Sequence, residues 1–319
     1  MDNKHINDRI FNCGIVPVIK LDDANDAAPL MQALSAGGVD VMEITFRTDA
    51  AEQAIRNVAD SGALVGAGTV SNVERLKRAI DAGAKFIVSP GFNHEVVKYC
   101  VDNNICVIPG VGGPTDIEAA LSYGLDTLKF FPAETNGGVK ALKAISAPYG
   151  GVRFMPTGGI DINNLSSYLT LDSVIACGGT WIVRDDLIKS KNFNEITRLT
   201  REAVKAVHSF AFAHLGINSA DEAAAGAQAV AFTDLFGFSQ RDIGASIFST
   251  DYIEIIKSQG AGEFGHIGIK CTNAARAIAY FEAKGVELDY DSVKMRNNKP
   301  VFVYLKNPVG AFMVHIVQS

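Results

Sequence analysis

Eight short, apolar, β-rich runs recur along the first two-thirds of the chain, each followed by a polar turn and an amphipathic segment. The runs begin at Gly14, Val39, Ala63, Lys85, Ile105, Asp126, Val152 and Ser173. Strands that alternate with helices are typical of parallel βαβ units. Eight such units in succession predict an α/β domain, a closed (β/α)₈ or TIM barrel. A doubly wound open sheet is the alternative that this pattern leaves open.

The pattern changes after the helical segment FNEITRLTREAVKAVHSF, and no Gly/Ser/Pro linker separates the two parts. The pairs AHLGI/GHIGI and YIEII/FMVHI mark an internal repeat, which predicts a βαβββ unit used twice in an α+β domain. The segment SADEAAAGAQAVAFTDLFG is expected to be a helix with Ser219 as its N-cap. We therefore expect two domains, residues 1–208 and 209–319.

Charge and composition exclude several classes of protein. A formal charge of −6 and a pI near 5.5 exclude a broad basic surface for nucleic acid. No stretch approaches the roughly 18 apolar residues of a membrane span, and the N-terminus lacks the apolar core of a signal peptide. The five cysteines have no CxxC spacing. We expect a cytoplasmic protein with reduced thiols and neither a nucleic acid nor a membrane partner.

Lys129 lies inside the sixth run, DTLKFFP, between apolar neighbours. Lysines are rarely buried without a partner, and loss of hydration disfavours the charged ammonium form. A neutral amine in an apolar pocket can attack a ketone to form an iminium, which serves as an electron sink for C–C cleavage. The structural alternative is a lysine paired with a buried carboxylate.

Polar side chains also mark the ends of the second, third and fourth runs. Glu43, within VMEITFRT, suits proton transfer, and Arg47 at the end of that run offers a fork for a carboxylate. Thr69 and Pro90 lie at the same edge of the expected barrel. The alternatives are an internal salt bridge of Glu43 to Lys129 or Arg47, a surface ion pair, and ordinary βα turns.

Two glycine pairs follow the seventh and eighth runs, where phosphate commonly binds in such barrels. They are TGG at Thr157, Gly158 and Gly159, and GGT at Gly178, Gly179 and Thr180. Glycines there let backbone N–H groups approach an anion, although tight turns alone would explain them. The expected mouth has no HxH or carboxylate cluster for a divalent metal, which favours Schiff-base chemistry over a metal-stabilised enolate.

The motifs MEITFRT, VGAGTV, FIVSPG, LKFFPAE-NGGVKALKAI, PTGGI and CGGTW resemble the 2-keto-3-deoxy-6-phosphogluconate (KDPG) / 4-hydroxy-2-oxoglutarate (KHG) aldolase family, over nearly the whole first domain. The resemblance implies a homotrimer that needs no metal, with a Schiff base on Lys129 and Glu43 as general acid and base. It places pyruvate among Arg47, Thr69, Pro90 and Phe131, the substrate hydroxyl at Thr157, and phosphate at the two glycine pairs and Thr180.

Two departures affect what the resemblance implies about specificity. Thr180 stands where the family usually has Ser, and the loop after the fifth run reads PGVGGPTDIE rather than PGxxTxxE. The implied reaction cleaves KDPG to pyruvate and glyceraldehyde 3-phosphate. KHG, or an unphosphorylated 2-keto-3-deoxy acid, is the alternative substrate for the same chemistry.

The C-terminal repeats resemble the vicinal-oxygen-chelate (glyoxalase-like) superfamily, with GHIGIKC and YIEIIK the better matches. On that template the four metal-ligand positions are His214, Glu254, His266 and His315, although the last is normally Glu. Imidazole and carboxylate suit Zn²⁺, Ni²⁺ or Fe²⁺. The alternative is that these are ordinary strand residues. A competing hypothesis for the whole chain is a metal-dependent enzyme or sensor of this class with a degenerate barrel.

Overall fold

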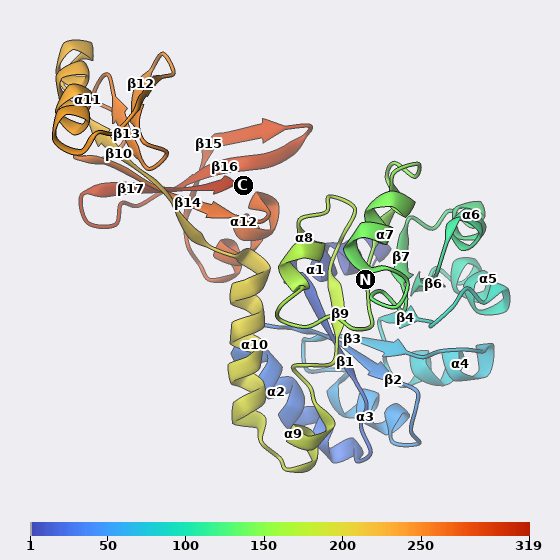
Figure 1. The fold of residues 1–319 in the computed structure, drawn as a ribbon. Helices are drawn as coiled ribbons and strands as arrows, with labels where there is room; N and C mark the ends of the chain where they lie inside the picture. The colour runs from blue at the N-terminus through green and yellow to red at the C-terminus, as the bar shows by residue number, and fades with distance from the viewer. Residues whose placement is uncertain (1) are drawn as a thin grey trace. The chain divides into compact units, whose positions relative to one another are not determined.

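The computed structural model describes residues 2–319, and the chain divides into two compact units, Met1–Val207 and His208–Ser319 (Figure 1). Each unit is described by itself. Among the described residues, no helix combines the length and the apolar character that crossing a membrane would require.

Parallel strands and helices alternate through the first unit. The strands are β1 (Ile15–Ile19), β2 (Val41–Thr45), β3 (Leu64–Gly68), β4 (Phe86–Val88), β5 (Cys106–Ile108), β6 (Gly110–Val111), β7 (Thr127–Phe130), β8 (Arg153–Phe154) and β9 (Cys177–Gly179). The helices are α1 (Asn3–Cys13), η1 (Ala24–Asp26), α2 (Ala27–Gly37), α3 (Ala51–Val58), α4 (Val73–Asp81), α5 (His94–Asp102), α6 (Pro114–Ser122), α7 (Gly138–Ser146), α8 (Leu165–Leu169), α9 (Asp185–Lys189) and α10 (Phe193–His208), whose last residue begins the second unit.

The strands close into a ring of eight runs. The hydrogen-bonded order is β5-β4-β3-β2-β1-β9 in one sheet and β6-β7-β8 in another. Pro109, which has no N–H to donate, separates β5 from β6 within one run. Parallel bridges join Phe154 to Val174 and Thr157 to Gly178, so the run of β8 reaches that of β9. The barrel prediction is confirmed, and the open-sheet alternative is wrong.

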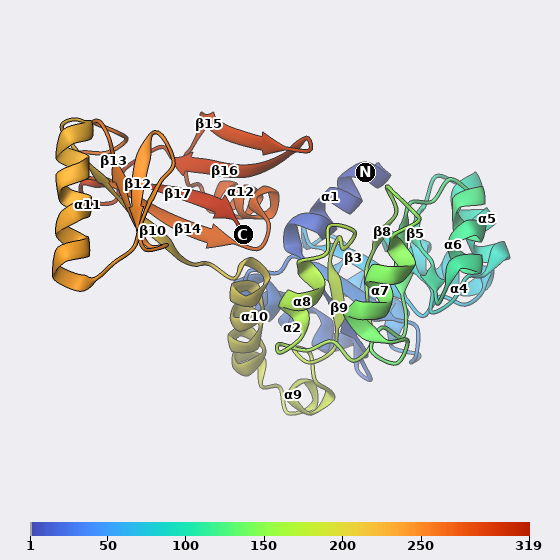
Figure 2. The ribbon, with the colours of Figure 1, turned by 45° about the horizontal axis from the view of Figure 1, so that its top comes forward.

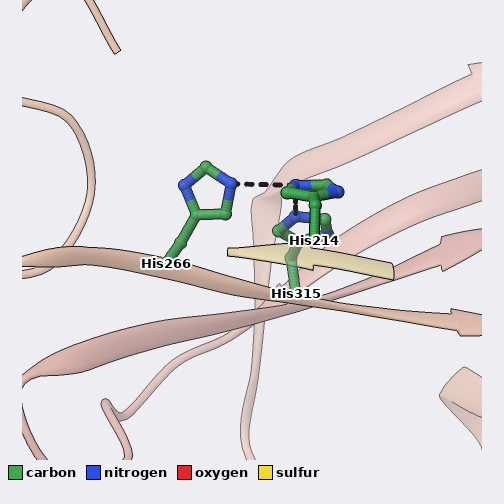
Figure 3. A group of neighbouring side chains, drawn as sticks. All are labelled: His214, His266 and His315. Carbon is green, nitrogen blue, oxygen red and sulfur yellow. Dashed lines mark hydrogen bonds between the residues drawn. The ribbon is translucent and has the colours of Figure 1, made fainter. Parts of the chain in front are cut away.

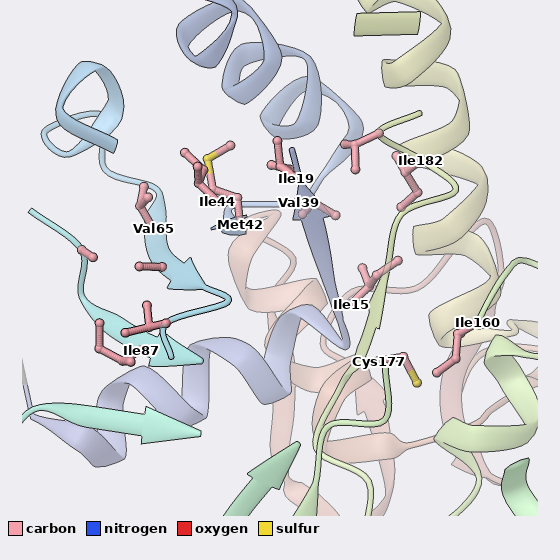
Figure 4. Close-up of a cluster of buried hydrophobic side chains, with 14 of the residues drawn as sticks. Ile15, Ile19, Val39, Met42, Ile44, Val65, Ile87, Ile160, Cys177 and Ile182 are labelled. Carbon is pink, nitrogen blue, oxygen red and sulfur yellow. The ribbon is translucent and has the colours of Figure 1, made fainter. Parts of the chain in front are cut away.

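Side chains of the barrel strands alternate between two buried layers. One layer, which includes Ile15, Ile19 and Ile44, packs between the strands and the surrounding helices (Figure 4). The other includes Val41, Phe86, Ile108 and Met155 together with Ile6 and Ile10 of α1, and it fills part of the barrel interior. The sequence analysis did not identify α1, whose N-cap is Asp2. This apolar filling makes the interior a packed core rather than a channel.

The second unit is a βαβββ unit used twice, as the repeat predicts. The first repeat contains β10 (Ala211–Asn218), α11 (Glu222–Phe236), β11 (Gln240–Asp242), β12 (Ser246–Ser249) and β13 (Ile253–Ile256). The second contains β14 (Gly265–Cys271), α12 (Ala274–Ala283), β15 (Leu288–Arg296), β16 (Lys299–Leu305) and β17 (Phe312–Gln318). The sheet order β11-β12-β13-β10-β14-β17-β16-β15 is the same outward from the central β10–β14 pair on both sides.

Two details of this unit differ from the sequence analysis. Asp221, not Ser219, caps α11, because its side chain accepts a hydrogen bond from the backbone N–H of Ala224. Ser219 is buried and donates instead to the side chain of Gln228. The edge strands β11 and β15 were not located, since their largely polar, exposed residues give little alternation of apolar and polar positions.

The helices of the second unit pack against one face of each half of the sheet (Figure 2). Ala225 and Ala229 of α11 lie in one apolar cluster with Ile255, and α12 contributes to a second cluster that contains Val303 and Ile316. Successive strand residues point to opposite faces, so the neighbours of Ile255 and Ile316 in sequence face away from the helices. Glu254 and His315 are such neighbours.

Candidate active site and metal centre

Lys129 and Glu43 meet inside the barrel. Lys129 Nζ lies 3.3 Å from Glu43 Oε1, and the two residues are 5% and 0% exposed. The same nitrogen lies 5.4 Å from the centre of the Phe131 ring. Glu43 Oε2 is buried without a hydrogen-bond partner. The pair therefore leaves one carboxylate oxygen available for a group that enters the site.

The barrel makes room for this pair by omitting a side chain on the neighbouring strand. Gly68 of β3 lies beside Glu43, and a Cβ at that position would stand 2.0 Å from Glu43 Oε1. The register pairs Glu43 with Gly66 and Thr45 with Gly68 across β2 and β3. Because the removal of a charge from water is costly, the opposite charge of Lys129 offsets the burial of this carboxylate. A lysine that only pairs with a buried carboxylate and a lysine that attacks a ketone would therefore occupy the same position beside Glu43.

A cavity of about 150 Å³ opens next to the pair. The sequence-predicted residues that line it are Glu43, Arg47, Thr69, Pro90, Lys129, Phe131, Thr157, Gly158, Gly159, Gly179 and Thr180. Gly178 does not line it; this glycine lies behind Thr157, where an added Cβ would stand 2.3 Å from Thr157 Oγ1. The cavity therefore brings together all but one of the residues expected at the barrel mouth.

Three further residues line the cavity: Val18, Thr45 and Ile160. Strand periodicity supplies a signal for Thr45, because it lies two residues after Glu43 within β2 and must point to the same side of the strand. Thr69 adopts a φ of 57°, which is rare for a β-branched residue. Its backbone is held at the cavity wall in a sparsely populated conformation.

The fold and this site define a class of protein: a (β/α)₈ barrel with a buried lysine–carboxylate pair beside a cavity at the carboxyl ends of its strands. The family model described as KDPG and KHG aldolase matches residues 6–199. The chain belongs to this family.

Several known proteins are similar to the first unit. A 2-dehydro-3-deoxy-phosphogluconate aldolase of Haemophilus influenzae is 45% identical over 206 residues, which cover 64% of this chain and 97% of that protein. The KHG/KDPG aldolase of Escherichia coli K12 is 46% identical over 193 residues, 60% of this chain and 91% of that protein. Both matches leave more than a third of this chain uncovered.

Solved structures agree with this assignment. The KDPG aldolase of Legionella pneumophila, with pyruvate captured as a covalent carbinolamine intermediate, has a TM-score of 0.60 and 38% identity, covering 62% of this chain and 97% of its own. The Zymomonas mobilis ZM4 enzyme with 3-phosphoglycerate has a TM-score of 0.59 and 39% identity, covering 63% and 95%.

A second polar cluster lies on the sheet of the second unit, formed by His214, Glu254, His266 and His315, which we call the four-ligand cluster. His214 Nε2 lies 3.0 Å from His266 Nε2 and 3.1 Å from His315 Nε2 (Figure 3). Glu254 Oε2 lies 3.3 Å from His214 Nε2 and 3.2 Å from His266 Nε2. All four side chains at the sequence-predicted positions therefore converge.

The internal repeat itself makes this convergence possible. Each repeat carries the tripeptide His-x-Gly, and the antiparallel register of β10 and β14 places His214 opposite Gly268 and Gly216 opposite His266. A Cβ on Gly216 would stand 2.2 Å from the His266 ring, and one on Gly268 would stand 2.7 Å from the His214 ring. Each imidazole thus occupies the space above the other strand's glycine. The repeat is visible in the sequence, but the packing of each imidazole against the glycine of the opposite strand depends on the register of β10 and β14.

Burial and mutual contacts set the charge of the cluster. Burial, with the neighbouring imidazoles of His266 and His214, lowers the pKa of His315 to about 3, and burial also lowers the pKa of His214. Burial raises the pKa of Glu254, but hydrogen bonds from His266 and Ser246 outweigh it and bring the value to about 2. At neutral pH the cluster therefore offers neutral imidazoles at His214 and His315 and an ionised carboxylate at Glu254, which are the forms that bind a cation.

Proposed function

We propose that the first unit is a class I aldolase that cleaves KDPG to pyruvate and glyceraldehyde 3-phosphate through a Schiff base on Lys129. The observation that carries this proposal is the 3.3 Å approach of the buried Lys129 Nζ to Glu43 Oε1, beside a cavity of about 150 Å³. The roles of the individual residues are part of the proposal.

Schiff-base formation begins when Glu43, the nearest acidic group, takes a proton from Lys129 and the freed amine attacks the C2 ketone. Glu43 gives this proton to the ketone oxygen, then takes a second proton from the nitrogen and returns it to the departing hydroxyl. One water leaves and a C=N⁺ bond joins the lysine to C2. Arg47 binds the substrate carboxylate with its guanidinium fork, and Thr69, Pro90 and Phe131 surround the pyruvate portion.

Cleavage then breaks the C3–C4 bond. Glu43 removes the proton of the C4 hydroxyl, which Thr157 orients, and C4 leaves as an aldehyde while the bonding electrons enter the C=N⁺ group to give an enamine. Protonation at C3 and addition of one water release pyruvate and restore Lys129. Backbone N–H groups of the glycine pairs, with Thr180, hold the phosphate.

Borohydride trapping with pyruvate tests the covalent step. The expected result is a reduced pyruvate adduct on Lys129, located by peptide mass mapping, together with the loss of KDPG cleavage by about 10⁴-fold in a Lys129→Met variant. The exposed Lys143→Met serves as the control and should retain the adduct and the activity. An adduct on another lysine, or none, would refute the proposal.

KHG is the second candidate substrate, because the Escherichia coli relative carries a name that includes both activities. A Thr180→Val variant separates the two. Valine keeps the shape but removes the hydroxyl, so KM for KDPG should rise about tenfold while KM for KHG, which has no phosphate, stays within about twofold. Equal effects on both substrates would show that the hydroxyl of Thr180 does not bind the phosphate.

We further propose that the four-ligand cluster binds a divalent Zn, Ni or Fe ion. His214 Nε2 contacts three of its neighbours at 3.0–3.3 Å, yet one ring nitrogen carries at most one proton. Lone pairs therefore face one another at the centre of the cluster unless a cation lies between them. A bound ion would act there as a Lewis acid, and Ser246 Oγ, 2.6 Å from Glu254 Oε1, would keep the carboxylate oriented.

Metal analysis of the purified full chain tests this second proposal. After dialysis against a chelator, titration with Zn²⁺, Ni²⁺ or Fe²⁺ should reach about one ion per chain, and His266→Ala should reduce the affinity by about 100-fold or more. His94→Ala, which removes an exposed imidazole of the first unit, is the control and should bind normally. The same substoichiometric content in both the wild type and His266→Ala would refute the proposal.

Two further expectations from the sequence also stand as proposals. A homotrimer would give a solution mass three times the 34.0 kDa of one chain, measured by light scattering. A cytoplasmic location would place the protein in the cytosolic fraction after cell lysis.

A further inference from the structure

The side chain of Thr45 connects β1 to the arginine of the proposed site. Thr45 is the last residue of β2, only 1% exposed, and lies between Glu43 and Arg47 on the side of the strand that faces the cavity. The intervening Ile44 and Phe46 belong to the opposite layer, against the helices. Thr45 therefore contributes a polar group to the cavity wall.

The hydrogen bonds of Thr45 have a fixed direction. Its Oγ1 donates to the carbonyl oxygen of Ile19 at 2.8 Å, because a carbonyl oxygen can only accept. The single hydroxyl proton is thereby committed to β1. The remaining lone pairs accept the N–H of Arg47 Nε at 3.0 Å. The end of β1 thus sets the orientation of the arginine through one hydroxyl.

This bond leaves the outer edge of the guanidinium available. Among residues 2–319, Nε of Arg47 is the one atom of that group with a hydrogen bond to the protein, and Arg47 has no ion pair. The residue as a whole is exposed, so its long side chain would otherwise sample many rotamers. With Nε held by Thr45, the two terminal nitrogens remain free to bind a carboxylate in the bidentate mode.

We infer that Thr45 is a positioning residue for substrate binding: it orients Arg47 so that the guanidinium receives the carboxylate of the keto acid. This inference rests on the proposed aldolase function. Since the hydroxyl of Thr45 bonds to Ile19 and Arg47 and acts on binding through the arginine, its loss should affect KM more than kcat.

Thr45→Val tests the inference, because valine keeps the volume and removes both hydrogen bonds. The expected result is a rise in KM for KDPG of about tenfold with kcat within about threefold of the wild type, and Thr45→Ser should restore the wild-type KM. Thr48→Val is the matched control: Thr48 Oγ1 donates to the carbonyl of Leu21, whereas Arg47 Nε donates to Thr45. Its KM should stay within about twofold.

A double-mutant cycle with Arg47→Ala shows whether the effect passes through the arginine. In the Arg47→Ala background, Thr45→Val should change KM by less than about twofold. An unchanged KM in Thr45→Val alone, or an equal rise in both backgrounds, would overturn the inference. If Thr45→Val does not fold, Thr45→Ala replaces it in the same cycle.

Borohydride trapping of pyruvate on the wild type separates this inference from the proposed function. Absence of a Lys129 adduct in the wild type refutes the aldolase proposal itself. A normal adduct combined with an unchanged KM in Thr45→Val refutes only the positioning role.

Discussion

In the barrel, the carboxylate of Glu43 lies beside Lys129, whereas in the four-ligand cluster of the second unit the carboxylate of Glu254 lies beside the imidazoles of His214 and His266. The two sites otherwise use the same steric device. Gly68 makes room for Glu43, and Gly216 makes room for the His266 ring. The comparison teaches that a missing side chain on the neighbouring strand positions each polar group, while the immediate partners of the buried carboxylate differ: a lysine in the barrel and imidazoles in the second unit.

Among the changes that test this comparison, the largest effect is expected from filling the space beside Glu43. In Gly68→Ala the added methyl would overlap Glu43 Oε1, so the carboxylate must move away from Lys129 and kcat/KM for KDPG should fall by about 10³-fold. Metal binding by the second unit should not change. Gly150→Ala, which has open space around the new methyl, is the control. Wild-type kinetics in Gly68→Ala would show that glycine is not needed to position Glu43.

The two units should also differ in their response to acid. Burial, with the charges of Arg276 and Lys284, lowers the pKa of His208 in the second unit to about 4. Its ring lies 4.2 Å from that of Tyr280 and stacks on Phe210. Between pH 6.5 and 4 the unfolded chain binds a proton that the folded one does not, so stability falls as the pH decreases, by about 3 kcal/mol in all.

Unfolding in urea at pH 7, 5 and 4 measures this loss. Trp181, the single tryptophan, lies in the first unit, so its fluorescence follows the barrel, while far-UV circular dichroism follows both units. In His208→Gln the free energy of unfolding of the second unit should lose about 3 kcal/mol less than in the wild type as the pH falls from 6.5 to 4. A slope identical to the wild type would mean that His208 is protonated in the folded state.

Filling the equivalent space in the second unit should weaken metal binding and leave the aldolase intact. Gly216→Ala displaces the His266 ring, and the affinity for the ion should fall by about 100-fold. Gly226→Ala, in α11 with open space around the new methyl, is the control. Wild-type metal affinity in Gly216→Ala would show that the packing of the His266 ring over Gly216 is not needed for metal binding.

The smallest effect is expected from Ser246→Ala. This change removes the hydroxyl that donates to Glu254 Oε1 but leaves all four ligands in place, so the affinity for the ion should fall only about tenfold. Isothermal titration of the metal-free protein measures it. A loss as large as that of His266→Ala would show that Ser246 is needed to form the site.

Prediction from the sequence succeeded where a residue's position follows from strand periodicity. Glu43 lies in β2, Arg47 follows two residues after the end of that strand, and Lys129 lies within a buried strand, so the pattern of eight repeats predicted all three at the barrel mouth. Helix α1 was missed because the barrel repeat does not include it. The polar strands β11 and β15 were missed because exposed edges carry little hydrophobic periodicity.

The sequence by itself determined the barrel, the internal repeat, the family resemblance and the identity of the candidate lysine, carboxylate and histidines. Only the tertiary structure decided which atoms meet: the hydroxyl of Thr45 that holds Arg47, the position of Gly178 behind Thr157, and the convergence of three histidines with Glu254 on one sheet. The physical reason is that periodicity fixes the direction of a side chain along its own strand. Contacts across strands also depend on register and on the space that neighbouring glycines leave, which no single segment encodes.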